Sequence, residues 1–345
     1  MNYTTANPPW ADKLIHDNWN RIAKFAVNNQ LPELITFAQL GVRDAAASPA
    51  EYKDDEVLWR EYGCGNWGCV YPTENPRVVC KLTADPDEIR TVMQISKIQA
   101  TSDVDGIVRY YGIVRLRGER LAIDSSRPTP VFLIWRESAD CGPTLSQIAA
   151  KHPGAADLAK AKPGKKLSSA AREALAIDAA WQLLVNSVEC ATLVYNTMSG
   201  AMGPKAEFKR VARLLPIARE WAETDSDYFL MLAGTDFLSS NERLNEANRP
   251  RETRGPDASV AYLLAGFELI VRYIGELGVI DSVAEALLKL YNSGVLCADV
   301  HQDNICPIRR SGGRLWAITD PGHSVLLGVR PISAPAAMAS FVAAI

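Results

Sequence analysis

The feature that most constrains the fold is a change of hydrophobic pattern part-way along the chain. Residues 56–137 contain short apolar runs separated by turn residues, which is typical of strands, whereas residues 142–295 are dominated by helical periodicity. Strands followed by helices in separate blocks predict an α+β fold with a small antiparallel sheet rather than an alternating α/β fold. The runs of strand character are 57–62, 69–72, 78–82, 107–116 and 131–135.

The organisation around this change predicts about two domains in 345 residues. Residues 1–55 are expected to form a helical N-terminal extension, with a helix over Ala11–Val27 and a second short helix over Pro32–Leu40. A helix opens at Asp85 and runs to about Ala100, because Asp85 can cap it and Pro86 suits its first turn. Further helices are expected over 170–198, 208–221, 260–277 and 281–292, with loops over 152–166 and 241–256.

Charge and hydropathy exclude several classes of partner. The 37 basic and 40 acidic residues give a net charge of −3, so no overall field attracts nucleic acid or anionic lipid. The most apolar long window, Val260–Ile280, carries Glu268, Arg272 and Glu276 near its middle. Such charges are costly inside a bilayer, so we expect a buried helix there rather than a membrane span.

The cysteines point to a reducing compartment. Their number, seven, is odd, and no Cys-x-x-Cys pair is present. We therefore expect neither a disulfide framework nor a zinc ribbon, and we predict a cytoplasmic protein whose cysteines are buried small hydrophobes.

A glycine-rich segment is the first candidate functional motif. Residues 63–71 read Gly-x-Gly-x-x-Gly-x-Val-Tyr and lie between two predicted strands. An isolated match of this kind is more often a glycine turn. Its place between two strands, however, favours a hairpin that covers nucleotide phosphates over a dinucleotide-binding βα turn. The candidate binding residues are Gly63, Gly65, Trp67, Gly68 and Val70.

The second motif is Lys81, which lies inside the apolar strand Val78–Leu82. A buried charge without a partner is expensive, and Glu88 at the start of the next helix is positioned to pair with it. The alternative is a lysine on an edge strand that faces water.

The third and fourth motifs lie near the C-terminus. Asp299 and Asn304 follow a predicted helix and form an Asp-x-x-x-x-Asn spacing. Asp320 follows sixteen residues later in Thr-Asp-Pro-Gly, and two short strands, 305–308 and 315–318, separate it from Asn304.

Taken in order, these motifs resemble those of the protein-kinase-like superfamily, over about residues 57–142 and 283–327. The resemblance implies a two-lobe fold, with a small antiparallel sheet in an N-lobe over 56–138 and a helical C-lobe over 139–345. The C-lobe would carry a large helical insertion at about 152–280 and its catalytic elements at 297–322.

The resemblance implies a role for each residue in transfer of the γ-phosphate of ATP. Lys81 would hold the α/β-phosphates and Glu88 would orient it. Asn304 and Asp320 would bind Mg²⁺, and Asp299 would accept or orient the proton of the attacking hydroxyl. The segment Ile134–Ser138, including Glu137, would be the hinge whose backbone meets the adenine. Lys81, Asn304 and Asp320 would then converge on one nucleotide.

The departures from the family pattern leave three functions open. His301 stands where protein kinases usually carry lysine, and histidine there is typical of the aminoglycoside and choline kinase branch. Pro321 replaces the phenylalanine of the Asp-Phe-Gly element, and Cys297-Ala298 replace the usual His-Arg. The sequence favours a protein Ser/Thr kinase that uses ATP and Mg²⁺. The alternatives are a kinase of a small hydroxylated molecule and a pseudokinase that serves as a binding module.

Overall fold

The computed structural model separates the chain into two compact units. Unit 1 comprises residues 1–96, 108–140 and 331–345, and unit 2 comprises residues 97–107 and 141–330. The residues that the structure describes are 9–35, 68–118, 129–139, 151–160, 166–174, 204–226, 255–276, 280–301, 304–322, 324–327 and 342–344, with single positions between 177 and 194 and Gly278.

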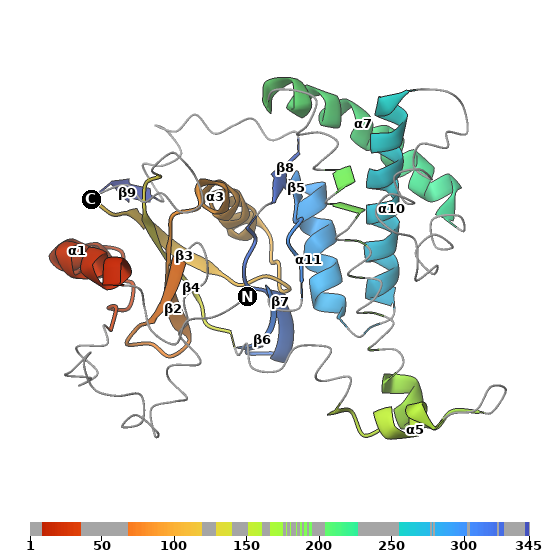
Figure 1. Ribbon diagram of the computed structural model, residues 1–345, viewed down its shortest axis with the longest axis horizontal. Helices are drawn as coiled ribbons and strands as arrows, with labels where there is room; N and C mark the ends of the chain where they lie inside the picture. The colour runs from red at the N-terminus through yellow and green to blue at the C-terminus, as the bar shows by residue number, and fades with distance from the viewer. Residues whose placement is uncertain are drawn as a thin grey trace. The chain divides into compact units, whose positions relative to one another are not determined.

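Unit 1 is built on a five-stranded sheet with the strand order β1-β2-β4-β3-β9 (Figure 1). Neighbouring strands are antiparallel, except that β9 runs parallel to β3. Of the five strands predicted for residues 56–137, the four that fall on described residues are confirmed, whereas the expected strand 57–62 lies outside the described residues. The strands are β1 (Gly68–Pro72), β2 (Val78–Thr83), β3 (Tyr110–Arg115), β4 (Phe132–Glu137) and β9 (Val342–Ala344).

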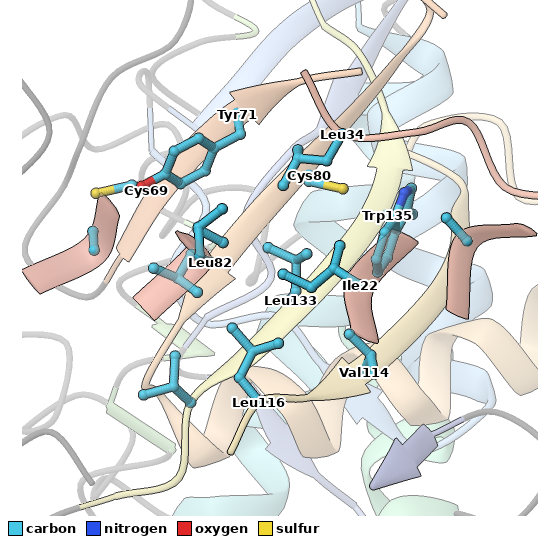
Figure 2. Packing of buried hydrophobic residues seen from close by; sticks show 14 of the residues in the cluster. Ile22, Leu34, Cys69, Tyr71, Cys80, Leu82, Val114, Leu116, Leu133 and Trp135 are labelled. Carbon is cyan, nitrogen blue, oxygen red and sulfur yellow. The ribbon is translucent and has the colours of Figure 1, made fainter. Parts of the chain in front are cut away.

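Helix α1 (Pro9–Asn28) covers one face of this sheet. Its apolar stripe, from Ala11 to Ala26, packs on residues of alternate positions in the strands, as expected for side chains of one sheet face. Figure 2 shows Ile22 of α1 among Leu133 and Trp135 of β4. The strand residues of this cluster are Cys69, Tyr71, Val78, Cys80, Leu82, Val114, Leu133 and Trp135, and Leu116 directly follows β3.

Helix α3 (Pro86–Thr101) begins where the sequence predicted. The carboxylate of Asp85 accepts a hydrogen bond from the Asp87 N–H at 2.8 Å, which satisfies one of the unpaired donors at the helix start. Figure 1 shows α3 and α1 on opposite sides of the sheet. The sheet of unit 1 therefore has two buried faces.

The predicted second helix, 32–40, is wrong at its first residues. Residues 32–35 are extended, and Leu34 forms a β-bridge with Thr73. The Ile35 N–H donates to the Pro72 carbonyl, and the Trp135 indole N–H donates to the Pro32 carbonyl at 3.1 Å. Pairing with the end of β1 determines this conformation, and local sequence pattern does not encode such a distant partner. Residues 36–40 lie outside the described residues.

The helices of unit 2 bury apolar stripes against one another. α10 packs against α7 and against α11. Every described position from 169 to 194 in the expected helix 170–198 is helical, and Ala171, Ala174, Leu184 and Val194 are among its buried residues. The other helices are α5 (Ala155–Ala159), inside an expected loop, α7 (Pro204–Thr224), α10 (Pro256–Glu276) and α11 (Asp281–Asn292).

α10 is the one helix in the described ranges that is long and apolar enough to cross a membrane by length and composition. In the protein 72% of that segment is buried, as expected for a core helix. The molecule is thus α+β, with a small, mostly antiparallel sheet and a set of packed helices.

Candidate functional site

In unit 1, Lys81 and Glu88 form the expected ion pair. The Lys81 Nζ lies 2.7 Å from a Glu88 carboxylate oxygen, and the two side chains are 11% and 3% exposed. Strand alternation turns Lys81 away from α1, because its neighbours Cys80 and Leu82 both pack in the α1 cluster. Lys81 therefore points to the face that α3 covers, where Glu88 lies in the first turn of that helix.

A third residue, Thr83, holds the Glu88 carboxylate in place. The Thr83 hydroxyl donates to Glu88 Oε2 at 2.7 Å and accepts from the Asp85 N–H at 3.1 Å. Glu88 thus has one oxygen on Lys81 and one on Thr83. Sequence inspection missed Thr83, although a polar residue two positions after Lys81, and hence on the same face, was the available signal.

The described part of the glycine-rich segment borders this pair. Val70 of β1 is the direct cross-strand partner of Lys81, so the two residues share a sheet face. At Gly68, a Cβ atom would lie 1.7 Å from the Leu82 carbonyl oxygen, so close approach of two backbones requires glycine there. Gly63, Gly65 and Trp67 lie outside the described residues.

Glu137, expected to border the adenine, is engaged within unit 1. Its N–H donates to the Arg109 carbonyl at 2.8 Å, and its carboxylate accepts from the Arg109 N–H at 3.1 Å. The Ser138 N–H donates to the Arg77 carbonyl at 2.8 Å. Two N–H groups of the expected hinge are thus already used by the protein.

In unit 2, two short β-pairings frame the loops that carry the other candidate residues. β5 (Val295–Leu296) pairs with β8 (Val325–Leu326), and β6 (Ile305–Arg310) pairs with β7 (Gly313–Ile318). The loop from β5 to β6 carries Asp299 and Asn304, and the loop from β7 to β8 carries Asp320. Because the same two pairings close both ends of both loops, these loops run side by side.

A hydrogen bond between Asn304 and Thr319 links the two loops. The Thr319 N–H donates to the Asn304 carbonyl at 2.8 Å, directly beyond the Ile305–Ile318 pair of the hairpin. Asp320 is the next residue, and its carboxylate accepts from the Gly322 N–H at 3.2 Å. The hairpin thereby brings Asn304 and Asp320, sixteen residues apart in the sequence, to one end of a ladder.

Asn304 also fixes the conformation of the Asp299 loop. Its Nδ2 donates to the Asp299 carbonyl at 2.9 Å and lies 3.0 Å from His301 Nε2. His301 Nε2 is in turn 3.7 Å from an Asp299 carboxylate oxygen, and both side chains are one-third exposed. These contacts use the amide nitrogen of Asn304 and leave its Oδ1 as an acceptor.

The oxygen atoms in this part of unit 2 suit a hard divalent cation. Mg²⁺ prefers oxygen ligands and is usually held by one or two carboxylates together with substrate phosphates. Asn304 Oδ1 and the Asp320 carboxylate match that set. No cluster of three or more His, Cys, Asp or Glu side chains suited to a metal is present among the described residues, and a magnesium site of this kind does not require one.

The cysteines depart in part from expectation. Cys69 and Cys306 each belong to a disulfide bond, which departs from the expectation that the cysteines form no disulfide framework. Cys80, Cys190 and Cys297 are buried free thiols, as expected. Burial raises the pKa of Cys297, two residues before Asp299, to about 11 against a weaker opposite effect of Ser324, so this thiol stays protonated near neutral pH.

In comparisons with known proteins, no family model, no curated protein and no solved structure matches the chain.

Proposed function

We propose that the protein is an ATP- and Mg²⁺-dependent phosphotransferase of protein-kinase-like fold, which transfers the γ-phosphate to a protein Ser or Thr hydroxyl. The observation that carries the proposal is the buried Lys81–Glu88 ion pair between a sheet strand and the first turn of a helix. Burying both charges of a pair is costly for the fold, and a hydrophobic pair of similar size would be as stable or more so. The presence of the pair therefore fits a need for a positioned cation.

In unit 1, Lys81 would bind the α/β-phosphates, and Glu88 would hold the lysine in place. Phosphoryl transfer depends mostly on positioning and on neutralising phosphate charge, so a lysine fixed by a buried carboxylate meets that need. The hydrogen bond from Thr83 supports the arrangement, because it keeps the second oxygen of Glu88 occupied.

In unit 2, Asn304 Oδ1 and the Asp320 carboxylate would hold Mg²⁺, which neutralises phosphate charge when bound. Asp299, whose side chain is one-third exposed, would orient the attacking hydroxyl and accept its proton. The proposal assigns the phosphates to residues of unit 1 and the metal ion and the attacking hydroxyl to residues of unit 2. Since the Glu137 and Ser138 N–H groups bond within unit 1, it assigns no adenine contact to those two donors.

A small-molecule kinase is the second candidate, and His301 is the observation that favours it. The contact of His301 with Asn304 ties it to the proposed metal-binding loop. A cationic small substrate would need an available acid in the helical insertion. Glu268, the buried acid of α10, forms an ion pair with Arg272 through Oε1, and its Oε2 lies 3.9 Å from Arg219 and has no hydrogen-bond partner among the described residues. A pseudokinase acting as a binding module is the third candidate.

We also propose that the protein is cytoplasmic and that it binds neither nucleic acid nor a membrane. The near-neutral net charge supports the absence of a nucleic-acid partner and of an anionic membrane surface. The disulfide-bonded state of Cys69 and Cys306 counts against a reducing compartment.

The decisive experiment is incubation of the purified protein with γ-labelled ATP, Mg²⁺ and a cell extract. Label on protein bands supports the proposal, and label on small molecules supports the second candidate. The absence of label with both acceptors, together with thermal stabilisation by Mg²⁺ and ATP, identifies a pseudokinase. The absence of both label and stabilisation overturns nucleotide binding.

A further inference from the structure

Arg136, in β4, is a buried cation without a carboxylate partner among the described residues. It is 9% exposed, and its Nε is fully buried with no hydrogen-bond partner in that part of the chain. Within the same residues, its guanidinium makes one hydrogen bond, from Nη1 to the Glu137 carbonyl at 3.5 Å, the outer limit for such a bond. Buried charges are normally paired or bind a ligand, because an isolated one costs several kcal/mol.

Strand register places Arg136 on the same sheet face as Lys81. Val79 pairs with Arg136 and Lys81 pairs with Ile134, so the four side chains share a face by alternation. A second observation agrees, because the neighbouring residue Trp135 packs in the α1 cluster and therefore points to the opposite face. Lys81 and Arg136 are thus diagonal cross-strand neighbours, roughly 7–8 Å apart at this kind of position and within reach of a common ligand.

The charges of Lys81, Glu88 and Arg136 do not sum to zero. Glu88 neutralises Lys81 through their 2.7 Å contact, whereas no carboxylate in the described ranges pairs with Arg136. Among the residues that the structure describes, one buried positive charge is therefore left over beside the lysine. The complement of a guanidinium, with its planar set of N–H donors, is a phosphate or a carboxylate.

We infer that Arg136 is a second anion-binding residue on the Lys81 face and contacts a phosphate of the ligand. This inference rests on the proposed function for the identity of the ligand, a nucleoside triphosphate. It gives a role to the Arg136 side chain, whereas the implied kinase roles use only the backbone of the segment Ile134–Ser138 that contains it.

The inference predicts opposite effects of one substitution on stability and on binding. Arg136→Gln removes a buried charge that no carboxylate in the described ranges neutralises, so we expect the melting temperature of the ligand-free protein to rise, by about 2–4 °C for each kcal/mol gained. The same change weakens binding of ATP with Mg²⁺ by about thirtyfold or more, because a charged partner of the phosphate is lost. A residue with only a structural role would lower the melting temperature when replaced.

The experiment compares the wild type, Arg136→Gln, Arg136→Lys and the control Arg77→Gln by thermal shift and calorimetry. Arg77 carries the same charge in the same unit but lies exposed in the β1–β2 turn. The probes are ATP with Mg²⁺, adenosine, and inorganic tripolyphosphate, which tests the phosphate contact without the base. We expect Arg136→Gln to lose affinity for ATP and tripolyphosphate and not for adenosine. We expect Arg136→Lys to keep part of the affinity, and Arg77→Gln to match the wild type.

The outcomes separate this inference from the proposed function. Tripolyphosphate binding that depends on Arg136, without ATP binding, supports the inference and overturns the proposed function. ATP binding that Arg136→Gln leaves unchanged overturns the inference alone. If Arg136→Gln loses ATP and adenosine affinity equally, Arg136 contacts the nucleoside and the inference is overturned. A fall in the melting temperature of Arg136→Gln with unchanged affinity for ATP also overturns the inference. No binding of any probe to the wild type overturns both.

Discussion

The Lys81 ammonium lies 2.7 Å from the Glu88 carboxylate, and both side chains are withdrawn from solvent. The pair joins the third residue from the end of β2 to the first turn of α3, and Thr83 hydrogen-bonds to the same carboxylate. Removing one partner of such a pair leaves the other charge buried and alone. The stability of the fold and the proposed activity therefore both depend on this contact, and single and double variants can distinguish the two effects.

Lys81→Met and Glu88→Gln should each destabilise the protein by about 3–5 kcal/mol, because each removes one charge of a buried pair. The double variant should recover most of that loss, since neither charge remains and the new amide oxygen can still accept from the Thr83 hydroxyl. Phosphotransfer should be absent in the double variant, because the cation that we propose to bind the phosphates is gone. Denaturant unfolding and the γ-phosphate assay measure the two effects.

Additive destabilisation in the double variant would contradict this prediction, because two uncoupled residues add their effects. Recovery of both stability and activity would show that Lys81 has no role in phosphotransfer.

Asp320→Asn should abolish the thermal stabilisation that ATP gives in the presence of Mg²⁺, because a neutral amide is a weak ligand for a hard cation. For the wild type, ATP at 100 times its dissociation constant adds about 2.7 kcal/mol. Asp299→Asn should keep this stabilisation and lose transfer, since it removes only the carboxylate that we propose as the proton acceptor. Asp281→Asn, an exposed aspartate in the first turn of α11, is the matched control. Equal loss of binding in the Asp299 and Asp320 variants would show that the two roles are not distinct.

The elements that the sequence predicts well are those in which local pattern and tertiary packing agree. Helix α11 has the bounds expected from its apolar stripe, and α3 starts at the predicted Asp85 cap. β9 could not be foreseen, because its three residues pair with β3 from more than 200 residues away. The extended Leu34 was missed for the same reason, since its partner Thr73 is distant in sequence.

In the candidate site, too, some contacts could be predicted from the sequence and others could not. The Lys81–Glu88 pairing followed from the cost of a charge in an apolar strand, and the loop contact of Asn304 with Asp299 reflects their short spacing. Arg136 stands in another apolar strand and offers the same kind of signal. Its lack of a counter-charge among the described residues, however, is a property of packing, and a sequence cannot show which carboxylates are out of reach.

Ile22→Ala should destabilise the protein by about 2–5 kcal/mol, because Ile22 is 1% exposed in the core between α1 and the sheet. The result would show that the N-terminal helix is an integral layer of unit 1. Val27→Ala on the same helix is the control, since Val27 is 63% exposed and its truncation creates no cavity. Chemical denaturation of both variants gives the comparison. Equal effects, or no loss in Ile22→Ala, would mean that α1 does not pack on the sheet.

The Tyr71 hydroxyl donates to the Asp12 carboxylate at 3.0 Å and links β1 to α1. Burial, and secondarily the negative charge of Asp12, raise the pKa of Tyr71 above its usual value near 10. A raised pKa means that the folded state favours the protonated phenol. The buried phenol therefore contributes its full stabilisation below about pH 10, and this contribution is lost as the pH rises above the pKa of tyrosine in the unfolded chain.

Tyr71→Phe should cost about 1 kcal/mol at neutral pH, the typical net value of one hydrogen bond. Above pH 10 the difference in unfolding free energy between the wild type and the variant should become smaller, because only the wild type carries a buried phenol that resists ionisation. Unfolding free energies measured from pH 7 to about 11 test this, and the difference between the two proteins cancels the effect of other titrating groups. A gap that stays constant over that range, or widens, would show that the Tyr71 hydroxyl is not buried against Asp12.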